Sequence, residues 1–461
     1  MKFPLSSAST IQFRRFVIED VAGMVQFPAG FQWGVSTSAH QFEGGNVHNQ
    51  WHEWECRGRI RSGDKSGNAC NWWLRAEEDL DRAQQLGLNA LRISLEWSRL
   101  EPKAGRWDKH ALHRYREILK AIRSRGMRVF ISLHHFTHPT WFEYRGAFTS
   151  NEGPHFFDLF AERAVTEFGD LCTDWVTFNE PNVYASFGYL FGEFPPGRVN
   201  DLQFGMAALL GAHRAHALAY DTIHRLQSDA GVGMAINYVV FRAATHSLAD
   251  RMLTRIYDAA FNRSTLSLLQ TGSMPGTMSV LAGRVPEVVG KIDFIGLNIY
   301  NRLHVRWPTG DNKTGGIFVP PNVPQGDHGC ELPYGEAFPD GVIPAVEAYS
   351  QLKKPIFILE NGVPDRSDRI RPWVIVKTLQ NIGVLIDRGF DIRGYFHWSL
   401  VDNFEWNEGW KLRFGLYEID PRTQKRSPRM SARLYRDIVT QNSISDYALE
   451  HFGREPIAKV G

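Results

Sequence analysis

Cysteine is scarce in this sequence, and its spacing excludes several kinds of site. Only four cysteines occur among 461 residues, at Cys56, Cys70, Cys172 and Cys330. No two of them form a CxxC pair, so the usual zinc-binding and redox motifs are missing. So few thiols in a chain of this length are typical of a reducing compartment, although they leave room for one disulfide.

Long apolar runs are also missing. No stretch approaches the roughly 18 consecutive apolar residues that a membrane-spanning helix requires. The first 23 residues carry Lys2, Arg14 and Arg15 but lack the continuous apolar segment of a secretory signal. We therefore expect a cytoplasmic protein that does not enter a membrane.

Neither sign of charge dominates. The 52 basic residues nearly balance the 50 acidic ones, and no basic stretch interleaved with aromatic residues is present. Nucleic acid is therefore not an expected partner. No GxGxxG segment follows a strand and opens a helix, which argues against a dinucleotide-binding open sheet.

Aromatic residues, in contrast, are plentiful: they form 13% of the chain and include 14 tryptophans. Most of these rings should pack in the core, where large aromatic side chains contribute much of the buried area. A surplus of tryptophan is also what a sugar-binding cleft needs, because indole faces stack on the C–H faces of pyranose rings.

Short apolar runs alternate with longer amphipathic stretches along the chain. Expected strands lie near residues 31–37, 89–95, 128–134, 174–179, 232–239, 293–299, 355–360 and 393–400. Helical patterns occupy 75–86, 110–126, 155–168, 204–227 and 371–388. Eight buried parallel strands alternating with helices predict one (β/α)8 TIM barrel with long βα loops. A long loop is expected at about 302–342, between strands six and seven.

The predicted catalytic domain spans residues 24–461, and residues 1–23 form an N-terminal extension. This extension shows no convincing helical period. It is interpreted as a mobile tail, a partner-binding arm, or sequence upstream of a start at Met24. In each case we expect it to contribute little to the core.

Two glutamates directly follow apolar strand runs. Glu180 lies in TFNEP at the end of strand four, and Glu360 lies in ILENG at the end of strand seven. Barrel enzymes place their active sites at these carboxyl ends, so both side chains should project into one mouth. Two carboxyl groups across a bond are what glycoside hydrolysis requires, with roughly 5–5.5 Å between them for covalent catalysis.

Several further motifs occur in order along the chain. They are FPAGFQWGVSTSAHQFEGG, LRISLEWSRLEP, LHHFTHP, TFNEPNV, GLNIY, ILENG and GYFHWSLVDNFEWNEGWKLRFGL. On these residues the chain resembles glycoside hydrolase family 1, the family of β-glucosidases and related enzymes, from about Phe27 to Ile438. The resemblance implies a retaining β-glycosidase that acts on small β-glycosides or oligosaccharides and requires no cofactor. Nothing in the sequence indicates an oligomeric state.

The resemblance also implies roles for individual residues. Glu180 matches the general acid/base and Glu360 the nucleophile. Tyr300 matches a phenol that contacts the nucleophile, and Arg92 matches an arginine beneath it, whose cation should lower the pKa of Glu360. The expected substrate-binding residues are Gln41, His135, Asn179, Asn298, Trp398, Glu405, Trp406 and Phe414. A negative Glu405 would disfavour 6-phosphorylated sugars. The peptide bond between Trp398 and Ser399 is expected to be cis.

One of the departures from the family pattern concerns the leaving-group side of the site. Where members usually carry a tryptophan that supports the leaving group, the segment YGEAFPDG has Gly335. Either another aromatic residue replaces that platform, or the leaving-group side of the cleft is wider.

A metal site, sugar binding without turnover and transglycosylation are the alternatives to hydrolysis. The histidines of LHHFTHP are spread along a strand end without an obvious acidic ligand, so no metal site is expected. A sugar-binding protein without turnover would keep the aromatic residues but lose a catalytic glutamate, and both glutamates are present. A transglycosylase would use the same residues and differ only in whether sugar or water enters second.

Overall fold

The barrel is closed by eight parallel strands. The computed structural model describes residues 24–308, 316–332 and 334–456, so the expected extension at 1–23 lies outside the described residues. The barrel strands are β2 (Gln32–Ser36), β3 (Ala90–Ser94), β4 (Arg128–His134), β5 (Asp174–Asn179), β6 (Gly231–Ala243), β7 (Phe294–Val305), β10 (Ile356–Asn361) and β11 (Ile392–His397). Each pairs in parallel with its neighbour, and the pairs β7–β10, β10–β11 and β11–β2 complete the ring. All eight expected strands are confirmed.

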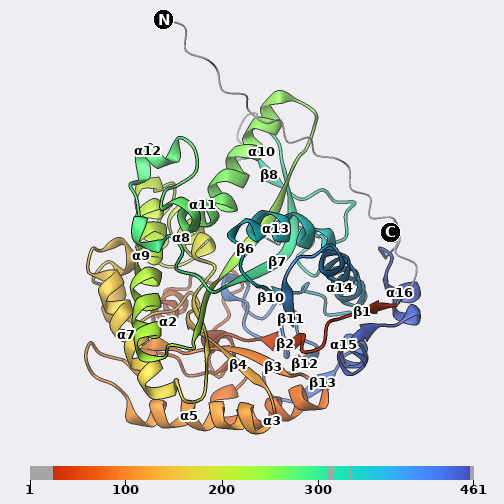
Figure 1. The fold of residues 1–461 in the computed structure, drawn as a ribbon, viewed down its shortest axis with the longest axis horizontal. Helices are drawn as coiled ribbons and strands as arrows, with labels where there is room; N and C mark the ends of the chain where they lie inside the picture. Colours follow the sequence, from red (N-terminus) through yellow and green to blue (C-terminus); the bar gives the residue numbers. More distant parts are fainter. Residues whose placement is uncertain (1–23, 309–315, 333, 457–461) are drawn as a thin grey trace, which may run out of the picture.

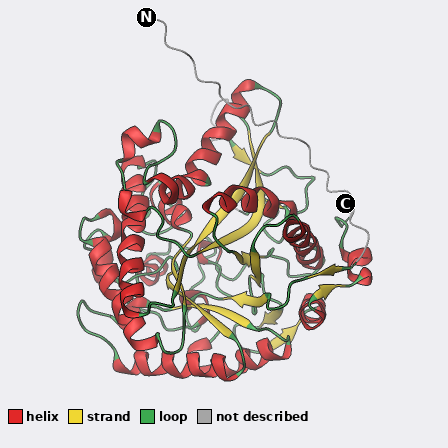
Figure 2. Ribbon diagram, viewed as in Figure 1, coloured by secondary structure: helices red, strands yellow, loops and turns green. Residues whose placement is uncertain are grey.

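Helices surround the barrel, as Figures 1 and 2 show. The five expected ones are α3 (Trp72–Gln85), α5 (Lys109–Ser124), α7 (Gly153–Phe168), α9 (Leu202–Leu226) and α14 (Arg371–Asp387). Shorter helices are α1 (Ala39–Phe42), α2 (Gln50–Cys56), α4 (Trp97–Leu100), α6 (Thr140–Glu143), α8 (Pro181–Tyr189), α10 (Leu248–Phe261), α11 (Arg263–Thr271), α12 (Met278–Ala282), α13 (Val342–Tyr349), α15 (Met430–Gln441) and α16 (Asp446–Phe452). Among the described residues, no helix has the length and apolarity to cross a membrane.

Helix α5 illustrates how local sequence sets these boundaries. The Asp108 side chain accepts hydrogen bonds from the backbone N–H groups of His110 and Ala111, which caps the helix start. Such a cap contributes about 1 kcal/mol. One face, including Leu112 and Tyr115, is buried against the barrel, so the amphipathic period that predicted the helix also explains its docking.

Phenylalanine rings fill the lower part of the barrel. The Phe130 ring lies 5.2 Å from the rings of both Phe357 and Phe396. Glycine is required opposite these rings, because a Cβ at Gly34 would lie 2.4 Å from the Phe396 ring. This packed interior leaves only the carboxyl ends of the strands open to a ligand, as is usual for such barrels.

The segment after the sixth barrel strand is more ordered than expected. Strand β7 continues to Val305 and pairs there with the extension of β6, so the loop expected from 302 begins later. Two short strands, β8 (Ile317–Phe318) and β9 (Glu336–Ala337), pair antiparallel with this extension. Figure 1 shows β6 and β7 reaching beyond the barrel toward α10. The expected loop therefore has a strand scaffold, although residues 309–315 and 333 lie outside the described part.

Segments near the described start and end of the chain lie side by side. Strand β1 (Val25–Gln26) pairs antiparallel with β14 (Ser443–Ile444), and β12 (Tyr417–Ile419) pairs with β13 (Arg426–Pro428). The Asn442 side chain accepts a hydrogen bond from the Trp33 indole at 2.8 Å. These contacts join the two ends of the fold, so the packed domain is already established close to Met24.

Candidate active site

The two expected carboxyl groups both lie at the mouth of the barrel and are buried. Glu180 follows β5 and begins α8, and its backbone N–H donates to the carbonyl of Ala235 on the neighbouring strand at 2.7 Å. Its φ of 48° places it in the left-handed region, which is uncommon for a residue with a side chain. Glu360 lies within β10. Glu180 is 6% exposed and Glu360 is 3% exposed, so both carboxyl groups are largely shielded from water.

Glu360 receives a hydrogen bond on each oxygen. Arg92 donates from Nη1 to Oε1 at 2.5 Å, and the Tyr300 hydroxyl donates to Oε2 at 2.6 Å. Bonds of this kind to an ionised acceptor are stronger than neutral ones. They hold the carboxylate in one orientation, as a nucleophile requires.

Arg92 is fully buried and organises the floor of the site. Its remaining donors reach Ser132 Oγ at 2.8 Å and Asn179 Oδ1 at 2.7 Å. The Asn179 side chain in turn contacts His135 Nε2 at 3.0 Å. One guanidinium therefore links β3, β4, β5 and β10, and brings three expected site residues into a single network.

Glu180 is held by two amides. Both Asn237 and Asn298 donate from Nδ2 to its Oε1, at 3.0 and 2.8 Å respectively. Asn237 was missed at the sequence level. Its position at the end of the apolar run VGMAIN was a usable signal, since the same reasoning selected Glu180 and Glu360.

The two carboxyl groups have different electrostatic environments. Burial, followed by the negative charge of Glu360, raises the pKa of Glu180 to about 8. Burial also raises the pKa of Glu360 above its usual value, while Arg92, Tyr300 and then Asn298 oppose that rise. The expectation that Arg92 lowers this pKa is confirmed, but desolvation is the larger effect, so the pKa of Glu360 still lies above its usual value.

Asn298 connects the two carboxyl groups. Its amide donates to Glu180, to Asn179, and also lowers the pKa of Glu360 through hydrogen bonding. One short side chain therefore interacts with both carboxyl groups, so the two groups lie close together at the mouth. A glycosidic bond bound between them would have one carboxyl group on each side.

The expected substrate-binding residues line the same mouth. Gln41 on α1 donates to Glu405 Oε2 at 3.1 Å and to Asn403 Oδ1 at 2.8 Å. The His135 ring lies 5.9 Å from that of Trp398 and 6.1 Å from that of Trp406. These groups supply polar hydrogen-bonding atoms beside flat aromatic faces, a combination suited to a sugar.

Phe414 completes the aromatic lining, since its ring lies edge-on to Tyr300 at 6.0 Å. The structure therefore brings together all twelve residues that the sequence selected. The peptide bond between Trp398 and Ser399 is cis, as the resemblance implied.

Two histidines of the LHHFTHP motif contact other side chains. His134 and His138 contact each other at 3.2 Å, and His138 contacts Glu143 at 2.7 Å. Within the described ranges, no group of three or more potential ligands could hold a metal ion. All four cysteines are free thiols, so the disulfide for which the sequence left room is not formed.

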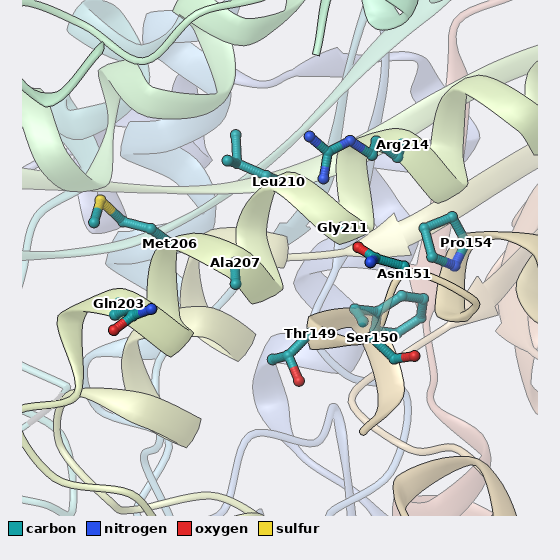
Figure 3. A pocket seen from close by; sticks show the side chains of 11 residues that line it. Thr149, Ser150, Asn151, Pro154, Gln203, Met206, Ala207, Leu210, Gly211 and Arg214 are labelled. Atoms are coloured by element: carbon teal, nitrogen blue, oxygen red, sulfur yellow. The ribbon is translucent and has the colours of Figure 1, made fainter. Parts of the chain in front are cut away.

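A separate cavity of about 410 Å³ lies on the outside of the barrel. Figure 3 shows it between the end of the 3₁₀ turn Ala147–Thr149 and one face of α9, with Gln203, Met206 and Arg214 along its rim. None of the residues lining it is an expected site residue. This cavity therefore lies apart from the buried carboxyl groups at the mouth of the barrel.

Known proteins are similar to this chain in both sequence and fold. Residues 24–444 match the model of glycosyl hydrolase family 1. The chain is 30% identical to a β-galactosidase of Sulfolobus acidocaldarius, covering 95% of this chain and 99% of the relative. Among solved structures, a β-glycosidase from Pyrococcus horikoshii is 32% identical with a TM-score of 0.85, covering 94% of this chain and 99% of its own. A β-glucosidase from Thermotoga maritima in complex with glucoimidazole is 28% identical with a TM-score of 0.84, covering 90% and 99%.

Proposed function

Because the chain belongs to glycosyl hydrolase family 1, we propose that it is a retaining β-glycosidase that removes terminal β-D-glucosyl residues. Glu360 is the nucleophile and Glu180 the general acid/base. The observation that carries this proposal is that two buried glutamates have different hydrogen-bond partners and different electrostatic surroundings. One is bound by a cation and a phenol, and the other is kept protonated by burial beside the first.

The reaction takes two displacements. Glu360 Oε attacks the anomeric carbon from one face while protonated Glu180 donates its proton to the departing glycosidic oxygen. The glycosyl–Glu360 ester is neutral, so the charge that helped to raise the pKa of Glu180 disappears. Glu180, now ionised, takes a proton from water, which attacks the anomeric carbon and releases Glu360. Two inversions give net retention.

Glu405 and Gln41 support a preference for sugars whose hydroxyl groups can pair with them. Both are buried polar groups at the mouth, and buried hydrogen-bonding groups discriminate strongly against ligands that leave them unpaired. Relatives in the family are named β-glucosidases and β-galactosidases, so β-galactosides are expected as secondary substrates. The four free cysteines support a reducing compartment, such as the cytoplasm, as its place of action.

A panel of aryl β-glycosides tests this assignment. We expect turnover of the β-glucoside, weaker turnover of the β-galactoside, and none of the α-glucoside. Proton NMR of the earliest product should show the β-anomer of the free sugar, because two inversions restore the starting configuration. Initial release of the α-anomer would mean a single displacement and would rule out Glu360 as a nucleophile. Sugar-transfer products that dominate even at low substrate would favour the transglycosylase alternative.

The pH dependence should be bell-shaped. Glu360 must be ionised, and its pKa is raised by burial, so kcat/KM falls on acidification at a pH above that of an ordinary carboxyl group. Glu180 must be protonated, so kcat/KM also falls as pH rises through about 8. The check is to repeat the profile with Glu180→Gln, which should lose the alkaline limb. If that limb persists, it belongs to another group, of which Glu405 is the first candidate because burial raises its pKa to about 8 too.

A further inference from the structure

Gly335 occupies a backbone position that accepts no side chain. Its φ is +65°, and a Cβ there would lie 2.6 Å from the carbonyl oxygen of Arg302 and 2.8 Å from the Leu303 side chain. Both distances are shorter than real contacts, and one partner is backbone. Close packing against β7 therefore excludes the family's tryptophan at this position, and it excludes any other side chain as well.

The chain around Gly335 is fixed on β7 by several polar contacts. Asn301 Nδ2 donates to the carbonyl of Tyr334 at 2.6 Å, and His328 Nε2 contacts the carbonyl of Gly335 at 2.6 Å. Arg302 Nε donates to Glu336 at 2.7 Å within the β9–β7 pairing. The backbone on both sides of Gly335 is thus held in place, and this directs the neighbouring Tyr334 side chain.

Tyr334 points into the site. Its hydroxyl donates to Glu405 Oε1 at 2.8 Å, and its ring lies 5.9 Å from Phe414 and 5.6 Å from His328. Because Phe414 packs edge-on to Tyr300, one run of aromatic rings extends from Tyr334 to the phenol that contacts Glu360. Tyr334 was not among the residues expected from the sequence, because the family motif marks the tryptophan position one residue later, at Gly335.

Glu405 therefore has both oxygens engaged by the protein, Oε1 by Tyr334 and Oε2 by Gln41. These two donors fix the orientation of the Glu405 carboxyl group. Its remaining lone pairs can accept a hydrogen bond from a sugar hydroxyl. The segment that carries Tyr334 is braced from outside by an ion pair between Lys411 and Glu331 at 2.7 Å. Arg61 adds a hydrogen bond to the carbonyl of Leu332 at 3.3 Å.

We propose that Tyr334 is a specificity-determining positioning residue, whose phenol orients Glu405 and so sets the preference for sugars with a hydroxymethyl group at C5. This rests on the proposed β-glycosidase function and adds to it a residue and a discrimination. A terminal glucoside presents its C4 and C6 hydroxyls to Glu405, whereas a xyloside has no C6 hydroxyl to donate. Orientation of Glu405 therefore matters more for the first sugar than for the second.

The test compares 2,4-dinitrophenyl β-D-glucoside with 2,4-dinitrophenyl β-D-xyloside, using the full chain. Tyr334→Phe keeps the ring and removes only the hydroxyl, so the fold should persist, which a melting curve checks. We expect the ratio of kcat/KM for glucoside over xyloside to fall about tenfold, because the lost hydrogen bond leaves a buried carboxyl oxygen of Glu405 unpaired. The loss should appear mainly as a higher KM for the glucoside, with kcat changed by less than about twofold.

Two controls separate positioning from a general structural effect. Tyr447→Phe removes a phenol from α16, where that side chain is 63% exposed, and should leave the ratio unchanged. Glu405→Gln should lower the ratio by itself, and adding Tyr334→Phe to it should produce little further change, because contacting residues are energetically coupled.

The outcomes are distinguishable. Equal losses on both sugars, an unchanged ratio, or independent effects of the two substitutions would each overturn the role of Tyr334. Failure of the underlying function would look different: Glu360→Ala would retain turnover of both sugars. An inactive Glu360→Ala together with an unaltered ratio in Tyr334→Phe would reject only the inference about Tyr334.

Discussion

Replacement of Glu360 by alanine is expected to lower kcat/KM for aryl β-glycosides by roughly 10⁴-fold or more, because the carboxylate that attacks the anomeric carbon is removed. The structure supports this expectation through the two donors, Arg92 and Tyr300, that aim the carboxylate. Initial rates with dinitrophenyl β-glucoside give the measurement. Glu450→Ala, which removes an exposed carboxyl from α16, is the matched control and should retain full activity.

Azide should restore part of the turnover of Glu360→Ala. The space left by the carboxylate lies on the face of the sugar opposite the leaving group, so the small anion attacks there and inverts the configuration once. The product should be the α-glycosyl azide, identified by its anomeric proton coupling. Formation of the β-azide would place the nucleophile elsewhere, and substantial activity without azide would remove Glu360 from the mechanism.

Replacement of Glu180 by glutamine should depend on the leaving group. For alkyl glycosides or disaccharides, whose departing oxygen needs a proton, kcat/KM should fall by roughly 10²–10⁴-fold. For dinitrophenyl glycosides, which depart without protonation, the same parameter should change little. Glutamine can still contact Asn237 and Asn298, so geometry is largely kept while the transferable proton is lost. A uniform loss across leaving groups would contradict the assignment.

The alanine variant at position 180 gives an independent check. Once the glycosyl–Glu360 ester has formed from a dinitrophenyl glycoside, azide can enter from the side that Glu180 normally guards. That second inversion yields the β-glycosyl azide, opposite to the product expected from Glu360→Ala. The pair of variants therefore assigns both faces of the sugar, and identical azide products from the two would be incompatible with the proposed roles.

The barrel strands were predictable because they are buried on both faces. Runs such as RVFISLH and PIFILE contain too few polar residues for a half-exposed strand, and each ends at a chemically distinctive side chain. The extension of β7 was not predictable in this way. Arg302 and His304 look like loop residues in the sequence, yet both pair with Glu336, more than 30 residues further along the chain.

The sequence by itself determined the order of the strands, the placement of Glu180 and Glu360 at two strand ends, and the family. These are local properties of residue type and spacing. Only the tertiary structure decided how the two carboxyl groups differ, because their pKa values depend on burial and on neighbours from other strands. For Glu180, one of those neighbours is Glu360. It also decided that Tyr334, and no residue at position 335, reaches Glu405. That outcome depends on the approach of the Gly335 backbone to Arg302, a contact between distant parts of the chain that no local pattern records.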